Sequence, residues 1–256
     1  MCVSQFWSTF AVCEQPSTLG MTIESALYLI PVPLSDSPME QVLPAPNAQI
    51  VGTLRHFIVE NVRSARRFLK KCDPSIVIDE LTFYELNRHT APQEISGFLN
   101  PLRQGVPMGV ISEAGCPAVA DPGADVVAIA QQEGLKVVPL VGPSSILMGL
   151  MGSGFNGQSF AFLGYLPIDE AGRNKKLREM QQNIVRNHQT QIFIETPYRN
   201  NSLLNELMRV LPGHLKLCVA SDITGERESI VTRSLKEWAH MKFDYNKVPT
   251  IFLLYQ

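Results

Sequence analysis

The sequence has 256 residues, of which 45% are hydrophobic and 18% are charged, and this composition excludes a largely disordered chain. Its 22 basic and 24 acidic side chains give a formal net charge of −2, which is too weak to indicate nucleic-acid binding through bulk charge. At roughly 100–200 residues per domain, the length predicts one large domain or two modest ones.

The sequence carries no signal for a membrane or for export. No apolar run approaches the roughly 18–20 residues that a membrane-spanning helix needs. The first basic residue is Arg55, whereas a secretory signal places positive charge ahead of its apolar stretch. The five cysteines form no C-x-x-C pair and no even framework, which is typical of a reducing compartment. We therefore expect a cytoplasmic protein without a membrane partner.

The opening residues 1–20 show neither a helical nor a strand period, and Met21 stands just before a clean apolar run. Two interpretations are open. Residues 1–20 are either a disordered extension or a misassigned start, with translation beginning at Met21, and we favour the latter.

From Met21 onward, short apolar runs alternate with helix-like stretches. This alternation predicts a parallel or mostly parallel α/β sheet in an N-terminal domain over residues 21–140. The expected strands cover residues 27–32, 56–60, 81–84, 106–111 and 136–140, and the expected helices cover residues 62–71, 92–103 and 124–133.

After residues 141–144 the pattern changes, which places the domain boundary near residues 138–142. The expected helices then cover residues 145–151, 170–187 and 201–210, and the expected strands cover residues 160–162, 191–195, 215–220 and 251–254. The sequence therefore predicts an α/β fold of two domains with parallel or mixed sheets, the second domain spanning residues 141–256.

Residues 152–157 match G-x-G-x-x-G literally, but a dinucleotide-binding fingerprint needs a strand before it and a helix after it. Here the predicted order is reversed, so we interpret these glycines as the exit of a helix. The five histidines are scattered along the chain and suggest no metal site.

Two strand ends run into small residues. Residues 110–123 place small side chains, prolines and glycines between a strand and a helix, and the carboxyl ends of parallel strands are where open α/β sheets bind ligands. A plain connection, with Asp121 as helix cap and Pro122 as first helical residue, explains part of this stretch equally well. Residues 139–145 form the second such place, where Ser144 is either a ligand contact or an ordinary cap.

These two stretches resemble the tetrapyrrole methylase superfamily, and most closely its ribosomal RNA small subunit methyltransferase I branch, the rRNA (cytidine-2′-O)-methyltransferases. The branch pattern V-S-D-A-G-T-P-x-x-x-D-P-G is matched by I-S-E-A-G-C-P-A-V-A-D-P-G at residues 111–123, and P-L-P-G-P-S-A by residues 139–145. Three further matches follow the family order: L-Y-x-V-x-T-P at residues 27–33, F-x-G-F-L-P at residues 162–167 and Y-E-S-P-H-R at residues 194–199.

The chain departs from the family pattern at three places. P-I-G-N-L is replaced by P-L-S-D-S at residues 33–37, E-D-T-R by E-N-V-R at residues 60–63, and the Asp of S-D-A-G by Glu113. These changes concern the expected substrate more than the cofactor, because the cofactor turns of this superfamily rely largely on backbone groups.

The resemblance implies S-adenosyl-L-methionine bound between the two domains, and a homodimer. Adenine and methionyl groups need apolar walls and backbone hydrogen bonds. Apart from Gly115, each residue expected there also has an ordinary core or cap explanation; the set is Pro33, Leu34, Ala114, Gly115, Cys116, Val119, Ser144, Ser145, Ile194, Ala220 and Thr250.

Methyl transfer from a sulfonium works chiefly by positioning, with modest help from a base for a hydroxyl nucleophile. The acids at strand ends are Glu60, Glu113 and Glu195, and the sequence does not single one out. The densest basic group, either an RNA contact or a solvated helix face, consists of Arg63, Arg66, Arg67, Lys70 and Lys71.

Three hypotheses follow. An RNA 2′-O-methyltransferase acting on ribosomal RNA is favoured by the closeness of the motifs. A small-molecule methylase acting on a corrin or porphyrin typically carries G-D-P where this chain has G-C-P at residues 115–117. A cofactor-binding protein whose catalysis has been lost is the third, and the altered residues 60–63 make it conceivable.

Overall fold

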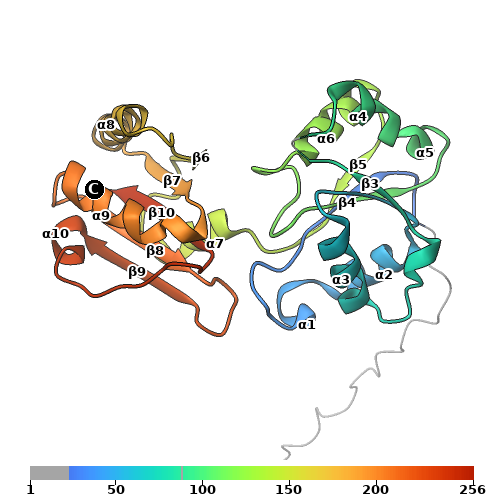
Figure 1. Cartoon of the computed structure of the whole chain (residues 1–256), viewed down its shortest axis with the longest axis horizontal. Helices are drawn as coiled ribbons and strands as arrows, with labels where there is room; N and C mark the ends of the chain where they lie inside the picture. The colour runs from blue at the N-terminus through green and yellow to red at the C-terminus, as the bar shows by residue number, and fades with distance from the viewer. Residues whose placement is uncertain (1–22, 88) are drawn as a thin grey trace, which may run out of the picture.

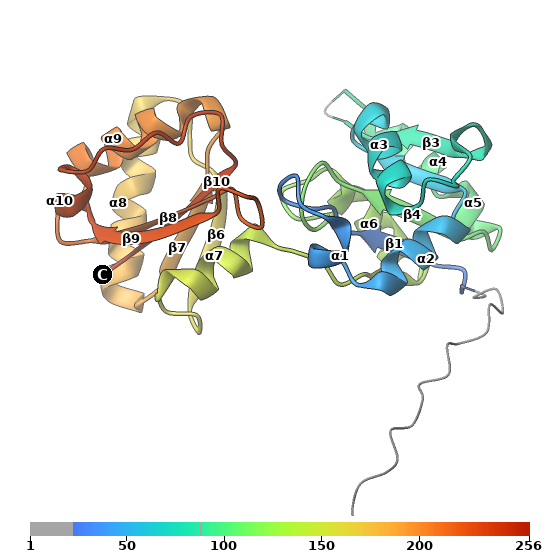
Figure 2. The ribbon, with the colours of Figure 1, turned by 90° about the horizontal axis from the view of Figure 1, so that it is seen from below.

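Two five-stranded sheets organise the chain into two lobes, joined by the segment that runs from the last strand of the first sheet to helix α7 (Figures 1 and 2). The computed structural model describes residues 23–87 and 89–256. The expectations for residues 1–20 and for a start at Met21 lie outside this range.

The first sheet is entirely parallel, as the strand–helix alternation predicts. Its spatial order is β3-β2-β4-β1-β5. Its strands are β1 (Leu27–Ile30), β2 (His56–Val59), β3 (Thr82–Glu85), β4 (Met108–Ile111) and β5 (Val137–Pro139).

Helices cover both faces of the first sheet, which is why its central strands are almost continuously apolar. Alternate residues along β1 and β2 enter two different cores: Tyr28 and Phe57 pack on one side, Leu27 and Ile58 on the other. Helices α2 (Ala45–Thr53) and α3 (Val62–Cys72) cover the first side, and α4 (Pro92–Phe98), α5 (Asn100–Arg103) and α6 (Gly123–Gln132) cover the second (Figure 1).

The second sheet is mixed. Its order is β6-β7-β10-β8-β9, in which β6 and β7 are parallel and every other pair is antiparallel. The strands are β6 (Phe160–Tyr165), β7 (Thr190–Ile194), β8 (Lys216–Ser221), β9 (Ser229–Ser234) and β10 (Thr250–Tyr255).

Helices again cover both faces of this sheet. Helix α7 (Ser145–Ser153) packs through Leu150 on the face that carries Ile192 and Leu253. The opposite face, with Phe193 and Phe252, is covered by α8 (Glu170–Asn187), α9 (Asn200–Val210) and α10 (Leu235–Trp238). The mixed two-sheet α/β architecture predicted from the sequence is therefore confirmed.

Several local predictions need correction. The helix expected over residues 92–103 is broken between α4 and α5, because Pro101 has no N–H to continue the ladder. Helix α6 begins one residue later than a cap at Asp121 would place it: Pro122 occupies the cap position, although the Asp121 carboxylate accepts a hydrogen bond from Gly123 N–H at 2.6 Å. The elements missed by the sequence reasoning include α1 (Met39–Val42), α2, β9, α10, and the 3₁₀ turns η1 (Ile78–Glu80) and η2 (Pro197–Arg199).

The glycine-rich stretch at residues 152–157 is the exit of helix α7, as predicted. The helix ends at Ser153, and Gly154 follows in the left-handed region with φ of 76°. Among the described helices, none is long and apolar enough to cross a membrane.

Candidate functional site

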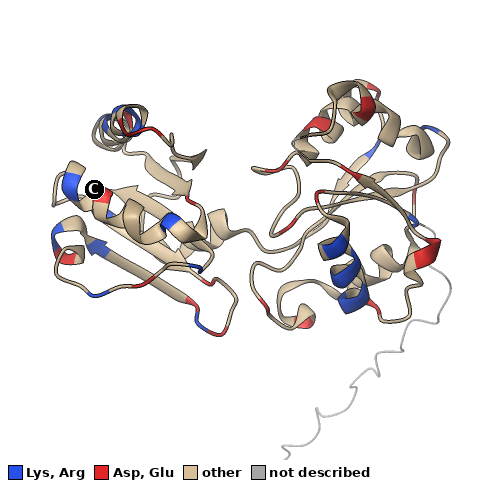
Figure 3. Ribbon diagram, viewed as in Figure 1, with Lys and Arg blue, Asp and Glu red and all other residues tan. Residues whose placement is uncertain are grey.

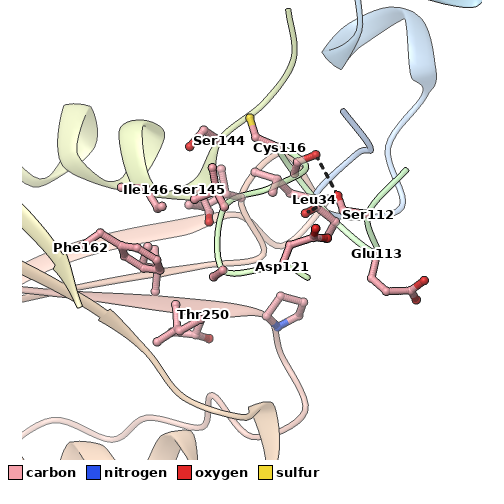
Figure 4. A pocket seen from close by; sticks show the side chains of 18 of the residues that line it. Leu34, Ser112, Glu113, Cys116, Asp121, Ser144, Ser145, Ile146, Phe162 and Thr250 are labelled. Atoms are coloured by element: carbon pink, nitrogen blue, oxygen red, sulfur yellow. Dashed lines mark hydrogen bonds between the residues drawn. The ribbon is translucent and has the colours of Figure 1, made fainter. Parts of the chain in front are cut away.

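A cavity of about 420 Å³ is lined by both lobes, at the end of β4 and along the facing edge of the second sheet (Figure 4). This volume falls within the roughly 300–1,000 Å³ typical of small-molecule sites. The first lobe contributes Leu34, Glu60 and residues 112–116 and 119–121. The linker and α7 contribute residues 144–146, and the second lobe contributes the rest.

The loop of residues 112–121 has a strained backbone. Gly115, Ala118 and Ala120 all have positive φ, at 70°, 64° and 57°, and the left-handed conformation costs an L-residue roughly 1–2 kcal/mol. The Asp121 carboxylate holds the loop by accepting hydrogen bonds from the N–H groups of Ala118 and Gly123 at 3.2 and 2.6 Å. Strain of this kind persists where surrounding structure enforces it, and it concentrates at functional sites.

Gly115 has two structural reasons to be glycine. Its backbone exchanges two hydrogen bonds with Val32, each 2.9 Å long, which tie the loop to the chain that leaves β1. A Cβ atom added at Gly115 would lie 3.1 Å from Leu34 Cδ2, and φ of 70° is unfavourable for any other residue. The glycine therefore shapes the cavity wall itself, because a side chain there would press on Leu34.

Hydroxyl groups enter the cavity with little other hydrogen bonding. Ser112 is buried, and its Oγ makes only long contacts of 3.4 and 3.5 Å to the carbonyls of Ala114 and Gly115 (Figure 4). Ser144 is the N-cap residue of α7, as one of the two interpretations expected, but its side chain forms no cap hydrogen bond. Burial raises the pKa of the neighbouring Cys116 thiol, which contacts the Pro143 carbonyl at 3.5 Å.

The second lobe provides a largely apolar wall. The side chains of Phe162 on β6 and Thr250 on β10 lie on the cavity side of their strands (Figure 4). Ile194 and Ala220, at the ends of β7 and β8, complete this wall. Apolar walls with a few converging hydroxyl and backbone groups are the usual composition of a site for an organic cofactor.

The three candidate acids all line the cavity but differ in environment. Glu195 is only 9% exposed, and its Oε1 accepts hydrogen bonds from the Thr196 backbone at 2.6 Å and from Arg199 Nη2 at 2.6 Å. Glu113 is exposed, accepts a hydrogen bond from Ser64 of α3 and points away from the other labelled side chains (Figure 4). Glu60 lies at the end of β2 and also lines the cavity.

Helix α3 carries a concentration of basic residues (Figure 3), and these residues lie outside the cavity lining. Lys71 forms an ion pair with Asp36 at 2.6 Å, and Lys70 donates to the Pro74 carbonyl at 2.9 Å. The Arg66 guanidinium lies 5.5 Å from the centroid of the Phe83 ring. Part of this basic surface is therefore engaged within the first lobe.

Most of the residues expected at the cofactor come together in the cavity wall, and Pro33 is the exception. The expected substrate residues Arg63, Arg66 and Lys70 lie on α3, outside it. Sequence reasoning missed several lining residues, although the match at residues 162–167 was a signal for two of them; the missed set includes Ser112, Asp121, Ile146, Phe162, Tyr165 and Pro197.

Two of the departures from the family pattern make contacts between the lobes or within α3. The Ser35 hydroxyl donates to Asp222 Oδ1 at 2.8 Å, and the Ser37 hydroxyl donates to the Thr224 carbonyl at 2.6 Å, joining the lobes beside the cavity. Asn61 is the cap of α3: its side-chain oxygen accepts hydrogen bonds from the two N–H groups of Arg63 and Ser64. Both changes thus have structural explanations.

Comparison with curated proteins finds several relatives of one kind. Ribosomal RNA small subunit methyltransferase I of Vibrio cholerae is 30% identical over 213 residues, which cover 82% of this chain and 69% of the relative. The proteins of the same name from Halalkalibacterium halodurans and Bacillus subtilis are 27% and 26% identical, covering 71% and 74% of their own lengths. No family model matches the chain.

Solved structures share the fold. The crystal structure of the methyltransferase CobJ superposes with a TM-score of 0.60 at 13% identity, covering 90% of this chain and 94% of that one. Uroporphyrin-III C-methyltransferase from Thermus thermophilus, in complex with S-adenosyl homocysteine, has a TM-score of 0.54 at 18% identity, covering 90% and 97%. At these identities the likeness shows the fold alone, and it agrees with the predicted tetrapyrrole methylase architecture.

Proposed function

This chain belongs to the ribosomal RNA small subunit methyltransferase I family, and from that premise we propose that it transfers a methyl group from S-adenosyl-L-methionine to ribosomal RNA. The observation that carries the proposal is the cavity, whose strained loop at residues 112–121 coincides with the longest of the family motifs. The acceptor implied by the family resemblance is the ribose 2′-oxygen of a cytidine.

The residues present fit this cofactor. The polar edge of the cavity, formed by Ser112, Ser144 and Ser145 with the backbone of residues 114–116, suits the amino, carboxylate and ribose groups. The apolar edge, formed by Leu34, Val119, Ile194, Ala220 and Thr250, suits the adenine ring. Backbone N–H and C=O groups of these loops can supply the hydrogen-bond donors and acceptors that such a ligand needs.

When bound, S-adenosylmethionine supplies a methyl group on a positively charged sulfur that leaves as a neutral thioether. The ribose oxygen forms the new O–C bond as the C–S bond breaks, and the hydroxyl proton passes to a base or to water. The chain's own contribution is to align the two reactants between rigid strand ends. Glu195 is a candidate acid with a buried carboxylate, and both Arg199 and the Thr196 N–H donate to its Oε1.

The test is methyl transfer in vitro. Purified protein is incubated with S-adenosylmethionine carrying a labelled methyl group and with small ribosomal subunits that lack ribose methylation, and the label is mapped on the RNA. We expect one labelled cytidine ribose. Transfer to uroporphyrinogen but not to RNA would favour a small-molecule methylase, and cofactor binding without transfer to either acceptor would favour a protein that has lost catalysis.

We also propose a cytoplasmic location and a homodimer for this protein. A ribosomal substrate agrees with the cytoplasmic location expected from the sequence, and fractionation of cells with an antibody tests it. The homodimer is implied by the family resemblance, and light scattering during size-exclusion chromatography gives the mass in solution.

A further inference from the structure

Strand β6 contains an irregularity at the edge of the cavity. In its pairing with β7, Phe162 lies opposite Ile192, and the next pair joins Tyr165 to Ile194. Three steps along β6 thus correspond to two steps along β7, so β6 carries one extra residue, a β-bulge. Gly164 lies within it and has φ of 66°, a conformation that favours glycine.

The bulge changes the direction of Tyr165. In a regular strand, side chains alternate between faces, so Phe162 would share its face with residue 164 and Tyr165 would point to the opposite side. The extra residue puts Tyr165 on the face of Phe162 instead, and both side chains line the cavity. Bulges beside active sites commonly re-aim a side chain in this way.

The Tyr165 side chain has no internal role that would explain its position. It is 55% exposed, whereas the aromatic residues of the second lobe's core are buried. Within residues 23–87 and 89–256, no other aromatic ring stacks on it and no side chain bonds to its hydroxyl, in contrast to Phe155 and Tyr255, whose ring centroids lie 5.6 Å apart. A large aromatic surface is thus left open at the mouth of the cavity.

The surroundings of Tyr165 suit a nucleotide. Tyr165 pairs with Ile194 of β7, and the next residue in the chain is Glu195. The buried Glu195 carboxylate forms an ion pair with Arg199, whose side chain is 41% exposed. An aromatic face and an acid therefore line the cavity together, and a partly exposed guanidinium is paired with that acid. Proteins that modify or read RNA often take an unpaired base out of its helix and stack it on such a face.

We propose that the nucleobase of the acceptor nucleotide stacks on Tyr165, which the bulge at Gly164 presents at the cavity mouth. This inference rests on the proposed function, because it takes RNA as the methyl acceptor. It assigns base recognition to the second lobe, whereas the basic residues of helix α3 lie outside the cavity lining. The alternative partner for the Tyr165 ring is the adenine of the cofactor. Stacking of the nucleobase and stacking of adenine predict different results for variants of Tyr165.

The test compares Tyr165→Phe, Tyr165→Leu and Tyr165→Ala. Two measurements are made on each variant: steady-state methylation of small-subunit RNA, and calorimetric binding of S-adenosyl homocysteine. We expect the KM for RNA to rise about tenfold or more in the Ala and Leu variants and to stay within about threefold in the Phe variant, because stacking needs the ring. Binding of S-adenosyl homocysteine should change by less than about twofold in all three.

Phe160→Ala is the matched control, since Phe160 is a partly exposed aromatic residue on the same strand outside the cavity lining. It should leave the KM for RNA unchanged. Equal KM values for Tyr165→Ala and wild type would overturn the proposal, and so would a parallel loss of S-adenosyl homocysteine binding, which would assign the ring to adenine. If the wild-type protein neither binds nor methylates RNA, the proposed function fails first, and that outcome differs from both.

Discussion

The two lobes build their shared cavity in different ways. The first lobe contributes mainly backbone: a loop with three left-handed residues, two of them alanines, pinned by Asp121 and by the paired backbones of Val32 and Gly115. The second lobe contributes mainly side chains, namely Phe162, Tyr165, Ile194, Glu195 and Thr250. We infer that the backbone wall of the first lobe serves mainly the cofactor, and that Tyr165 and Glu195 of the second wall are where acceptors are distinguished.

The largest effect is expected at the first wall, from Gly115→Val. At φ of 70° the branched side chain costs about 1–3 kcal/mol of folding free energy, and it pushes Leu34 from its position 3.1 Å from the new Cβ. We expect loss of S-adenosyl homocysteine binding in calorimetry, together with a lower melting temperature.

Gly134→Val separates these two effects. Gly134 has nearly the same φ, 69°, but its Cβ would meet no atom within 4 Å, and it lies outside the cavity lining. This variant should lose similar stability and retain full cofactor binding. If Gly134→Val also abolished binding, the loss in Gly115→Val would reflect unfolding and would say nothing about the cavity wall.

The second-largest effect is expected at the second wall, from Glu195→Gln. Removal of a positioned proton acceptor typically costs about 10²-fold in rate, whereas the isosteric amide keeps the shape of the site. Glu113→Gln is the comparison variant. Because the Glu113 carboxylate accepts a hydrogen bond from α3, we expect its loss to lower the methylation rate by less than about tenfold. Single-turnover methylation at saturating cofactor measures both. Equal losses in the two variants would contradict a role for Glu195 as the proton acceptor.

Much of the fold could be read from the sequence, because its strands are short apolar runs with clear ends. The long helix α8 was predicted with its observed bounds, Glu170–Asn187, since polar residues flank a regular apolar spacing. Elements without such periodicity were missed. Helix α2 buries only Asn47 and Val51, and β9 has no fully buried residue, so tertiary packing rather than local pattern determines both.

The first wall was also predictable, whereas the second was predictable only in part. Residues 114–116 lie in one continuous motif, so a single strand end identifies them. Tyr165 belongs to the cavity because an extra residue shifts the register of β6 against β7, and a shift between two strands is not encoded in either strand alone. Likewise, the Arg199–Glu195 pair depends on the turn η2 between β7 and α9.

A smaller effect is expected on α3, whose cations, if they contact RNA, bind phosphates rather than bases. Neutralising Arg66, Lys70 and Lys71 together should lower the slope of log Kd against log salt concentration by about 1.4. This value corresponds to two lost phosphate contacts at roughly 0.7 per contact. The third cation, Lys71, is already paired with Asp36. The slope of log Kd against log salt concentration measures this.

The control for α3 carries the same change in net charge on another basic helix. Lys175, Lys176 and Arg178 of α8 are neutralised together, and the salt slope should then stay at the wild-type value. Equal slopes in both triple variants would show that α3 responds only to overall charge, and would make it a solvated helix face.

The smallest effect is expected at Asn61, where this chain departs from the acid of the family pattern. Because the Asn61 side chain caps α3, Asn61→Ala should cost about 1 kcal/mol in urea unfolding. Asn61→Asp keeps the accepting oxygen and adds negative charge at a helix start, so stability should be equal or slightly higher. Its methylation rate should equal that of the wild type, because capping requires only the oxygen. A tenfold or greater gain in rate for Asn61→Asp would instead show that catalysis needs an acid at position 61, and would support the hypothesis of impaired catalysis in this chain.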